Sequence, residues 1–176
     1  MIQHLKRKEG FTLIELLLVV IVLGILAALA IPQFTDASKD ARESTLKGDL
    51  ATIRGAIERY YHEHNSTYPG AVEHTTGSGA PADPEASFVA QLTLYSDKNG
   101  KTSPTLDRAN YPYGPYLRDR IPENQLAEST ASAAKDGVNV TTSASAISAD
   151  ANPTKGWKYS SVTGQFIANS SGYDTW

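Results

Sequence analysis

The stretch Lys6-Arg7-Lys8-Glu9-Gly10-Phe11-Thr12-Leu13-Ile14-Glu15 leads directly into an unbroken apolar run from Leu16 to Ile31. A short basic head and a glycine therefore precede a membrane-length apolar segment with one carboxylate near its start. Phe11 to Ile31 spans 21 residues. As a helix this segment rises about 31 Å, close to the roughly 30 Å hydrocarbon core of a bilayer. We therefore predict a transmembrane helix over residues 11–31.

The basic head predicts the orientation of this helix, because positive residues next to a membrane segment stay on the cytoplasmic side. The chain from about Pro32 onward is then expected outside the cytoplasm. Ala28 and Ala30 before Ile31 imitate the small-x-small cleavage site of a secretory signal. A cleaved export signal or a plain single-pass anchor is the simpler alternative. It leaves the carboxylate unexplained, and an intramembrane carboxylate by default indicates a function and a partner.

These residues resemble the type IV pilin and type II secretion pseudopilin superfamily. The match comprises Gly10-Phe11-Thr12-Leu13-Ile14-Glu15-Leu16-Leu17 and continues through Gly24 to Ile31-Pro32-Gln33-Phe34. The resemblance implies cleavage between Gly10 and Phe11 by a prepilin peptidase, with N-methylation of the new Phe11 amine. It also implies assembly of the mature chain into a helical filament. Its specific part covers about the first 70 residues, and residues 1–10 are then the leader peptide.

The position of Glu15 agrees with that chemistry. Cleavage after Gly10 creates a positive α-amino group on Phe11, four residues before Glu15. In a filament, the ammonium of an incoming subunit would pair with Glu15 of its neighbour, and removing one member of a buried pair is strongly destabilising. Phe11 and Glu15 are therefore the predicted assembly residues. No second titratable group accompanies Glu15, so we expect a protein that is not an enzyme.

Gly24 and Pro32 weaken the same helix at two places. Glycine costs about 1 kcal/mol relative to alanine in a helix interior, and proline about 3 kcal/mol. Both residues are common in membrane helices, where they mark only a kink. Similarity to filament-forming pilins implies more, namely that the backbone between Gly24 and Pro32 unwinds when subunits pack.

Past Pro32 the pattern becomes amphipathic. Apolar residues recur at spacings of four, three, four and three, which defines one helical stripe of Leu46, Leu50, Ile53, Ile57 and Tyr60. Charged residues between them predict a solvated face of Lys47, Asp49, Arg54, Glu58 and Arg59. We expect the helix to continue over residues 32–65 and to end near His62–Asn65, where Asn65-Ser66-Thr67-Tyr68-Pro69-Gly70 supplies breaker residues.

Residues 66–176 are predicted to form one globular domain with a modest core. The sequence Asp83-Pro84-Glu85 supplies an N-cap, a first-turn proline and an acid for a helix from Ala86 to Ser96, with Phe88, Leu92 and Tyr95 on one face. Trp157–Ser160 and Gln165–Asn169, separated by Thr163-Gly164, alternate as a β-hairpin. The expected fold class is α+β and pilin-like: a long N-terminal helix packed on a small antiparallel β-sheet.

Two further segments refine this expectation. Tyr113 to Asn124 resembles the "GPYL…IPENP" loop of type II secretion major-pseudopilin-like proteins, with Gln125 in place of the expected proline. Residues 127–154 are rich in Ala, Ser, Thr and Asn, which predicts a polar surface insertion, partly ordered around Val138–Val140. The chain has no cysteine. It therefore cannot form the C-terminal disulfide loop of many type IV pilins, which favours a pseudopilin-like protein.

The charge and composition of the chain restrict the kinds of ligand that we expect it to bind. Loss of the leader removes three positive side chains and one negative one, so the formal net charge goes from −3 to −5. An acidic exported domain argues against nucleic acid as a partner. The resemblance implies calcium binding through a C-terminal acidic loop, with candidate carboxylates Asp136, Asp150 and Asp174. Their spacing lacks the dense Gly/Asp pattern of such loops, so we expect no cofactor and no metal ligands, with calcium as the alternative.

The sequence therefore predicts a structural subunit of a type II secretion pseudopilus. It is expected in the inner membrane as a single-pass protein, with a cytoplasmic N-terminus and a periplasmic domain, and in a filament after assembly. The resemblance implies as partners further copies of the chain, a prepilin peptidase, an inner-membrane assembly platform, other pseudopilins and the lipid bilayer. One alternative is a type IV pilin of a surface filament for adhesion, motility or DNA uptake. The other is a membrane-anchored receptor that binds carbohydrate or DNA.

Overall fold

The computed structural model describes residues 10–127 and 134–176, with the backbone only at residues 29, 30 and 32. The predicted leader, apart from Gly10, lies outside the described residues, as does part of the predicted insertion. The contacts divide the chain into two compact units, Met1–Ala41 and Arg42–Trp176. The boundary falls within the long helix, and each unit is described separately. The domain boundaries expected from the sequence stay predictions.

The first unit contains the beginning of helix α1 (Leu13–Glu63). The large apolar side chains that the structure describes there are exposed, from Phe11 at 87% to Phe34 at 76%. A helix that is apolar on all sides is normally covered by other protein or by lipid. This is the one helix among the described residues that is long and apolar enough to cross a membrane. It is helical at both Gly24 and Pro32, so unwinding between them stays a prediction about the filament.

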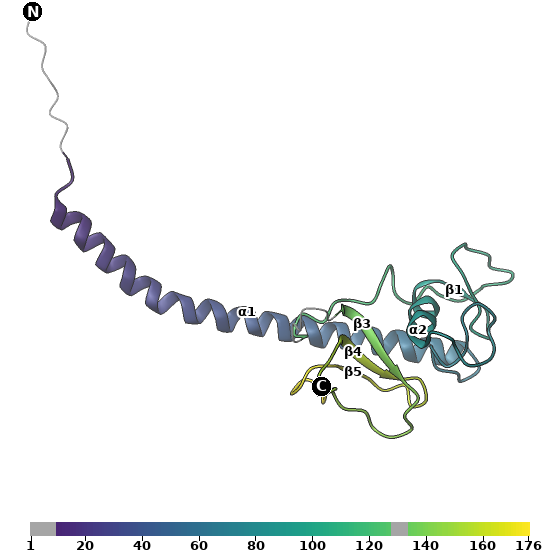
Figure 1. The fold of residues 1–176 in the computed structure, drawn as a ribbon. Coiled ribbons are helices and arrows are strands. Elements are labelled where there is room, and N and C mark those ends of the chain that lie inside the picture. Colours follow the sequence, from purple (N-terminus) through teal and green to yellow (C-terminus); the bar gives the residue numbers. More distant parts are fainter. Residues whose placement is uncertain (1–9, 128–133) are drawn as a thin grey trace, which may run out of the picture. The chain divides into compact units, whose positions relative to one another are not determined.

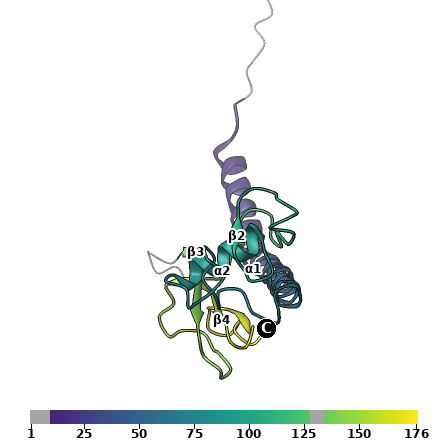
Figure 2. The same ribbon diagram turned by 90° about the vertical axis from the view of Figure 1, so that its right-hand side faces the viewer.

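The second unit is built on the C-terminal part of α1, which ends at Glu63 as expected. The predicted stripe is confirmed, because its side chains are at most 2% exposed: Leu46, Leu50, Ile53, Ile57 and Tyr60. The predicted solvated face is confirmed only in part, because Arg54 is half-buried and donates to the Phe166 carbonyl. Figures 1 and 2 show α2 and strands β3 to β5 alongside this part of α1.

Helix α2 (Pro84–Thr93) begins as predicted, with the Asp83 carboxylate accepting from the backbone N–H groups of Glu85 and Ala86 at 3.0 and 3.1 Å. It ends earlier than predicted. The Leu92 carbonyl accepts from the backbone N–H groups of Tyr116 and Leu117, both at 2.9 Å. Tyr95 then lies in strand β1 (Tyr95–Ser96), which pairs antiparallel with β2 (Thr102–Ser103), and the prediction that it shares the helix face is wrong.

The main sheet has the order β3-β4-β5. Strands β4 (Lys155–Ser160) and β5 (Phe166–Ala168) form the predicted antiparallel hairpin, with Tyr159 opposite Phe166. Strand β3 (Ala134–Thr141) pairs with β4 in parallel. The α+β pilin-like class is confirmed, and the sheet contains one parallel pair because a long connection separates β3 from β4.

The predicted insertion contributes to this core instead of lying wholly on the surface. Val138 of β3 is fully buried. The close approach of β3 to β4 depends on Gly156, since a Cβ built there would lie 2.0 Å from the Lys135 carbonyl oxygen. The segment Tyr113–Asn124 also packs inward, through Leu117 and Ile121. Its Pro122 carbonyl accepts from the Trp157 indole N–H at 2.8 Å.

Candidate functional site

The start of α1 forms a capping box between Thr12 and Glu15. The Glu15 Oε2 accepts from the Thr12 backbone N–H at 2.8 Å and from the Thr12 hydroxyl at 2.7 Å. In return, the Thr12 Oγ1 accepts from the Glu15 backbone N–H at 3.3 Å. This reciprocal pattern satisfies N–H groups that a helix start otherwise leaves without partners. Thr12 is therefore the N-cap, and Glu15 is the third residue of the helix.

The capping box holds the carboxylate in one place while leaving it accessible. Negative charge at a helix N-terminus is favoured by the helix dipole. Glu15 is exposed, and both bonds from Thr12 go to Oε2. Within residues 10–127 and 134–176, no hydrogen bond is found to Oε1. One carboxylate oxygen is thus engaged by its own chain, and the other retains its capacity for an outside donor.

The residues around Glu15 are suited to contact with other apolar surfaces. A shallow hollow of about 360 Å³ lies beside the helix start. It is lined by Phe11, Thr12, Leu13, Leu16, Leu17 and Val20. Gly10 precedes the helix in an exposed, non-helical stretch, and a Cβ at this position would meet nothing within 4 Å. The peptide bond between Gly10 and Phe11 therefore lies in an accessible segment.

Of the predicted site residues, Gly10, Phe11 and Glu15 lie within the first turn of α1 or directly before it. Gly24 and Pro32 lie further along the same helix. The processing role of Gly10 and Phe11, the methylation of Phe11 and the assembly roles stay predictions, because each involves another protein or another copy. Sequence reasoning missed Thr12. Its signal was present, since Thr-x-x-Glu before an apolar run is the capping-box pattern.

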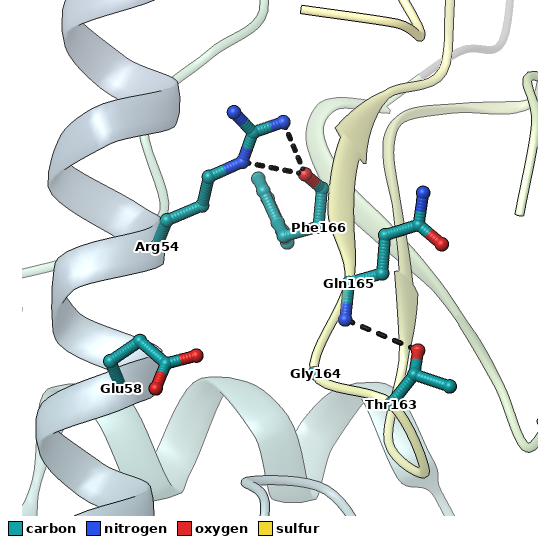
Figure 3. A pocket seen from close by; sticks show the side chains of 6 residues that line it. All are labelled: Arg54, Glu58, Thr163, Gly164, Gln165 and Phe166. Carbon is teal, nitrogen blue, oxygen red and sulfur yellow. Dashed lines mark hydrogen bonds between the residues drawn. The ribbon is translucent and has the colours of Figure 1, made fainter. Parts of the chain in front are cut away.

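A second hollow, of about 280 Å³, lies between α1 and the β4–β5 turn (Figure 3). Arg54 points across it and donates from Nε and a terminal nitrogen to the Phe166 carbonyl, at 3.0 and 2.8 Å. The same terminal nitrogen also donates to the Trp176 carbonyl oxygen. The guanidinium is thus used to hold β5 and the C-terminal residue against α1, and this hollow is a structural contact.

The three candidate calcium carboxylates do not converge. Among the described residues, no group of three or more acidic, histidine or cysteine side chains is arranged to hold a metal. Asp174 accepts from the backbone N–H of Ala149 at 3.1 Å. Burial alone would raise the pKa of the Asp150 carboxyl, but hydrogen bonds from Lys158, Asn139 and Asn169 outweigh it and hold the pKa below its ordinary value.

The fold and the helix start together define a class: proteins with an exposed apolar N-terminal helix that carries one carboxylate and continues into a small α+β domain. The family defined by the prokaryotic N-terminal methylation motif matches residues 5–31. The type II secretion system core protein G of Klebsiella pneumoniae is 31% identical over 120 residues, which cover 68% of this chain and 70% of that protein. The chain belongs to the type IV pilin and type II secretion pseudopilin superfamily.

Further relatives carry names from both branches of that superfamily. The type II secretion system core protein G of Pseudomonas aeruginosa is 37% identical over 83 residues, 43% of this chain, and the match spans 58% of that protein's length. The type IV narrow pilus major component of Thermus thermophilus is 42% identical over 102 residues, which cover 54% of this chain and 77% of that protein. No solved structure matches the chain significantly.

Proposed function

We propose that this chain is a structural subunit of a type II secretion pseudopilus that polymerises through its N-terminal helix to drive protein export. The observation that carries the proposal is the Glu15 carboxylate, fixed by Thr12 at the start of a helix whose described apolar side chains are exposed. Within a bilayer or an apolar filament core, such a charge is costly unless a partner compensates it. The partner is the Phe11 ammonium of another copy.

The proposed sequence of events begins in the inner membrane, with the basic head in the cytoplasm and the domain in the periplasm. A prepilin peptidase cleaves between Gly10 and Phe11, and the new Phe11 amine is methylated. An inner-membrane assembly platform then transfers the subunit from the lipid bilayer into the filament, beside other pseudopilins. The apolar side chains exchange lipid for the helices of neighbouring copies. The energy comes from a separate motor, and this chain acts as a structural element and not as an enzyme.

Two observations favour the pseudopilus over a surface pilus. Two relatives named type II secretion system core protein G align with this chain at 31% and 37% identity. The chain also lacks cysteine, so it has no disulfide-closed C-terminal loop. The alternative, a type IV pilin of a surface filament, is supported by the match to the Thermus thermophilus pilus component.

Shearing cells and blotting the released material tests the choice between these filaments. A pseudopilus subunit stays with the cells at native expression, whereas long sheared fibres that contain the chain would overturn the proposal in favour of a surface pilus. Glu15→Leu tests assembly itself. We expect the variant to be cleaved by the peptidase and to accumulate in the membrane without forming filaments. A Glu15→Leu chain that still forms filaments would overturn the assembly role of Glu15. A wild-type chain that forms no filaments, together with ligand binding that is unchanged in Glu15→Leu, would support a membrane-anchored receptor instead.

A further inference from the structure

The Lys158 ammonium lies in a network that joins strands β3 and β4 and the residue after β5 to the loop over residues 142–154. Its Nζ lies 2.6 Å from Asp150 Oδ1 and donates to the Ser148 carbonyl at 2.9 Å. Only 17% of the Lys158 side chain and 30% of the Asp150 side chain are exposed. A carboxylate and a main-chain carbonyl are oxygen ligands that a hard cation such as calcium also prefers.

The other Asp150 oxygen is occupied by amide donors. Its Oδ2 accepts from the Asn139 Nδ2 at 2.7 Å and from the Asn169 Nδ2 at 3.0 Å. The orientation of the Asn169 amide is fixed, because its Oδ1 accepts from the Asp150 backbone N–H at 2.8 Å and its Nδ2 also donates to the Lys155 carbonyl at 3.1 Å. Asp150 therefore faces hydrogen-bond donors at both of its carboxylate oxygens.

This donor set does not fit a calcium ion. Calcium takes six to eight oxygen ligands at about 2.3–2.6 Å. Around Asp150 the structure instead presents one ammonium and two amide nitrogens. An ion at this position would have to displace Lys158 and rotate the Asn169 amide away from two bonds that only its present orientation can make. The loop is already held by a positive charge that belongs to the chain itself.

We propose that the Lys158 ammonium takes the place of a divalent cation, so that the loop over residues 142–154 stays ordered on the sheet without calcium. The proposal rests on the fold alone and is independent of which filament the chain builds. It accounts for the partners of Asp150 and Asp174, two of the three candidate calcium carboxylates. Asp150 pairs with the internal cation, and Asp174 accepts from the loop backbone at Ala149.

Hydrogen–deuterium exchange on the full chain in detergent micelles tests this proposal. Three loop amides report on loop order, because each donates to a side chain outside the loop: Ile147 to Gln165, Ala149 to Asp174 and Asp150 to Asn169. In the wild-type chain we expect the same protection in millimolar calcium and in excess chelator. In Lys158→Met we expect exchange of these amides to rise on the order of tenfold, while amides of the α1 stripe keep their protection.

Lys135→Met is the matched control, since Lys135 is exposed on β3 of the same sheet, and it should leave the loop amides unchanged. Lys158→Arg retains the positive charge and should preserve most of the protection. Calcium that slows loop exchange in the wild-type chain would overturn the proposal, and so would a Lys158→Met chain that behaves like Lys135→Met. If Lys158→Met unfolds entirely, the wild-type comparison in calcium and chelator and the Lys158→Arg chain still decide the question.

Discussion

The Thr12 hydroxyl donates to the Glu15 carboxylate at 2.7 Å, and the Thr12 backbone N–H donates to the same oxygen at 2.8 Å. The carboxylate proposed to receive the ammonium of another copy is therefore held by its own chain before any partner arrives. Cleavage between Gly10 and Phe11 would leave this contact intact, because Thr12 keeps its amide and hydroxyl. The capping box thus fixes Glu15 through Thr12, the residue that directly follows the new N-terminus.

Thr12→Val removes the hydroxyl while keeping the size of the side chain and its backbone N–H. We expect cleavage to proceed and filament yield to fall roughly fivefold, the factor that corresponds to loss of a typical N-cap. Sheared-fibre blots after overexpression measure the yield, and the shift in chain size measures cleavage. Thr12→Ser restores the cap and should assemble like the wild-type chain. Equal yields from the valine and serine variants would contradict the role of Thr12.

Arg54→Met tests the contact that holds the C-terminal residue and β5 to α1. The guanidinium bonds to the carbonyl oxygens of Phe166 and Trp176 would be lost, and we expect the free energy of unfolding to fall by about 2 kcal/mol. Denaturant titration followed by Trp fluorescence measures the change. Arg59→Met is the control, because the Arg59 side chain is 65% exposed and an ion pair such as Arg59–Glu63 at the surface contributes little. Similar losses in both variants would contradict the assignment.

Gly156→Ala tests the close approach of β3 and β4. A Cβ at Gly156 would lie 2.0 Å from the Lys135 carbonyl oxygen, so β3 must move away and part of the sheet must open. We expect a loss of about 3 kcal/mol or more in the free energy of unfolding. Gly55→Ala, on an exposed face of α1 with nothing within 4 Å of its new Cβ, should instead stabilise the chain by up to about 1 kcal/mol. If Gly156→Ala leaves the free energy of unfolding unchanged, the two strands are less closely packed than the structure indicates.

Because the His64 ring is buried, we expect the protein to lose stability in mild acid. The ring is buried, with Nδ1 2.8 Å from the Tyr60 carbonyl oxygen and Nε2 2.9 Å from the Ser96 hydroxyl. Burial lowers the pKa of His64, although the hydrogen bond to Tyr60 and the charges of Glu63 and Asp97 oppose the shift. The unfolded chain then binds a proton more readily than the folded one. Stability is complete above the unfolded pKa of about 6.5 and falls as the pH drops through it towards the folded value.

Denaturant titrations between neutral pH and mild acid measure this effect. The wild-type chain should lose stability over that range, and His64→Gln should show a smaller dependence on pH at a lower overall stability. His62→Gln is the matched control, since it makes the same substitution at an exposed position two residues away. If the free energy of unfolding of His64→Gln falls with pH as steeply as that of the wild-type chain, other groups cause the acid sensitivity.

The sequence predicted the elements whose signal is local and periodic. The α1 stripe from Leu46 to Tyr60 repeats with the helical period, and the Asp83 cap and the Thr163-Gly164 turn have their own residue signatures. The prediction for Tyr95 is wrong because its position depends on pairing with β2 and on the bonds to the Leu92 carbonyl near the end of α2. Strand β2 follows after a short turn, whereas Tyr116 and Leu117 come much later in the chain, and neither contact leaves a periodic trace.

The candidate site could likewise be predicted only where its signal is local in the sequence. Glu15 was conspicuous as a charge in an apolar run, and the capping box with Thr12 could have been read from the Thr-x-x-Glu spacing. The buried position of Val138 could not be predicted from the sequence, because it depends on the parallel pairing of β3 with β4. The contact between Lys158 and Asp150 likewise requires the loop over residues 142–154 to fold back on β4.

The central claim is that the Phe11 ammonium of one copy pairs with Glu15 of another. A structure of the assembled filament, obtained from overexpressed chain by electron cryo-microscopy, tests it most directly. The account predicts a distance of about 4 Å or less between the Phe11 nitrogen of one copy and a Glu15 carboxylate oxygen of its neighbour, the range of an ion pair. A filament in which Glu15 contacts only Thr12 of its own chain, with no ammonium of another copy beside it, would contradict the account.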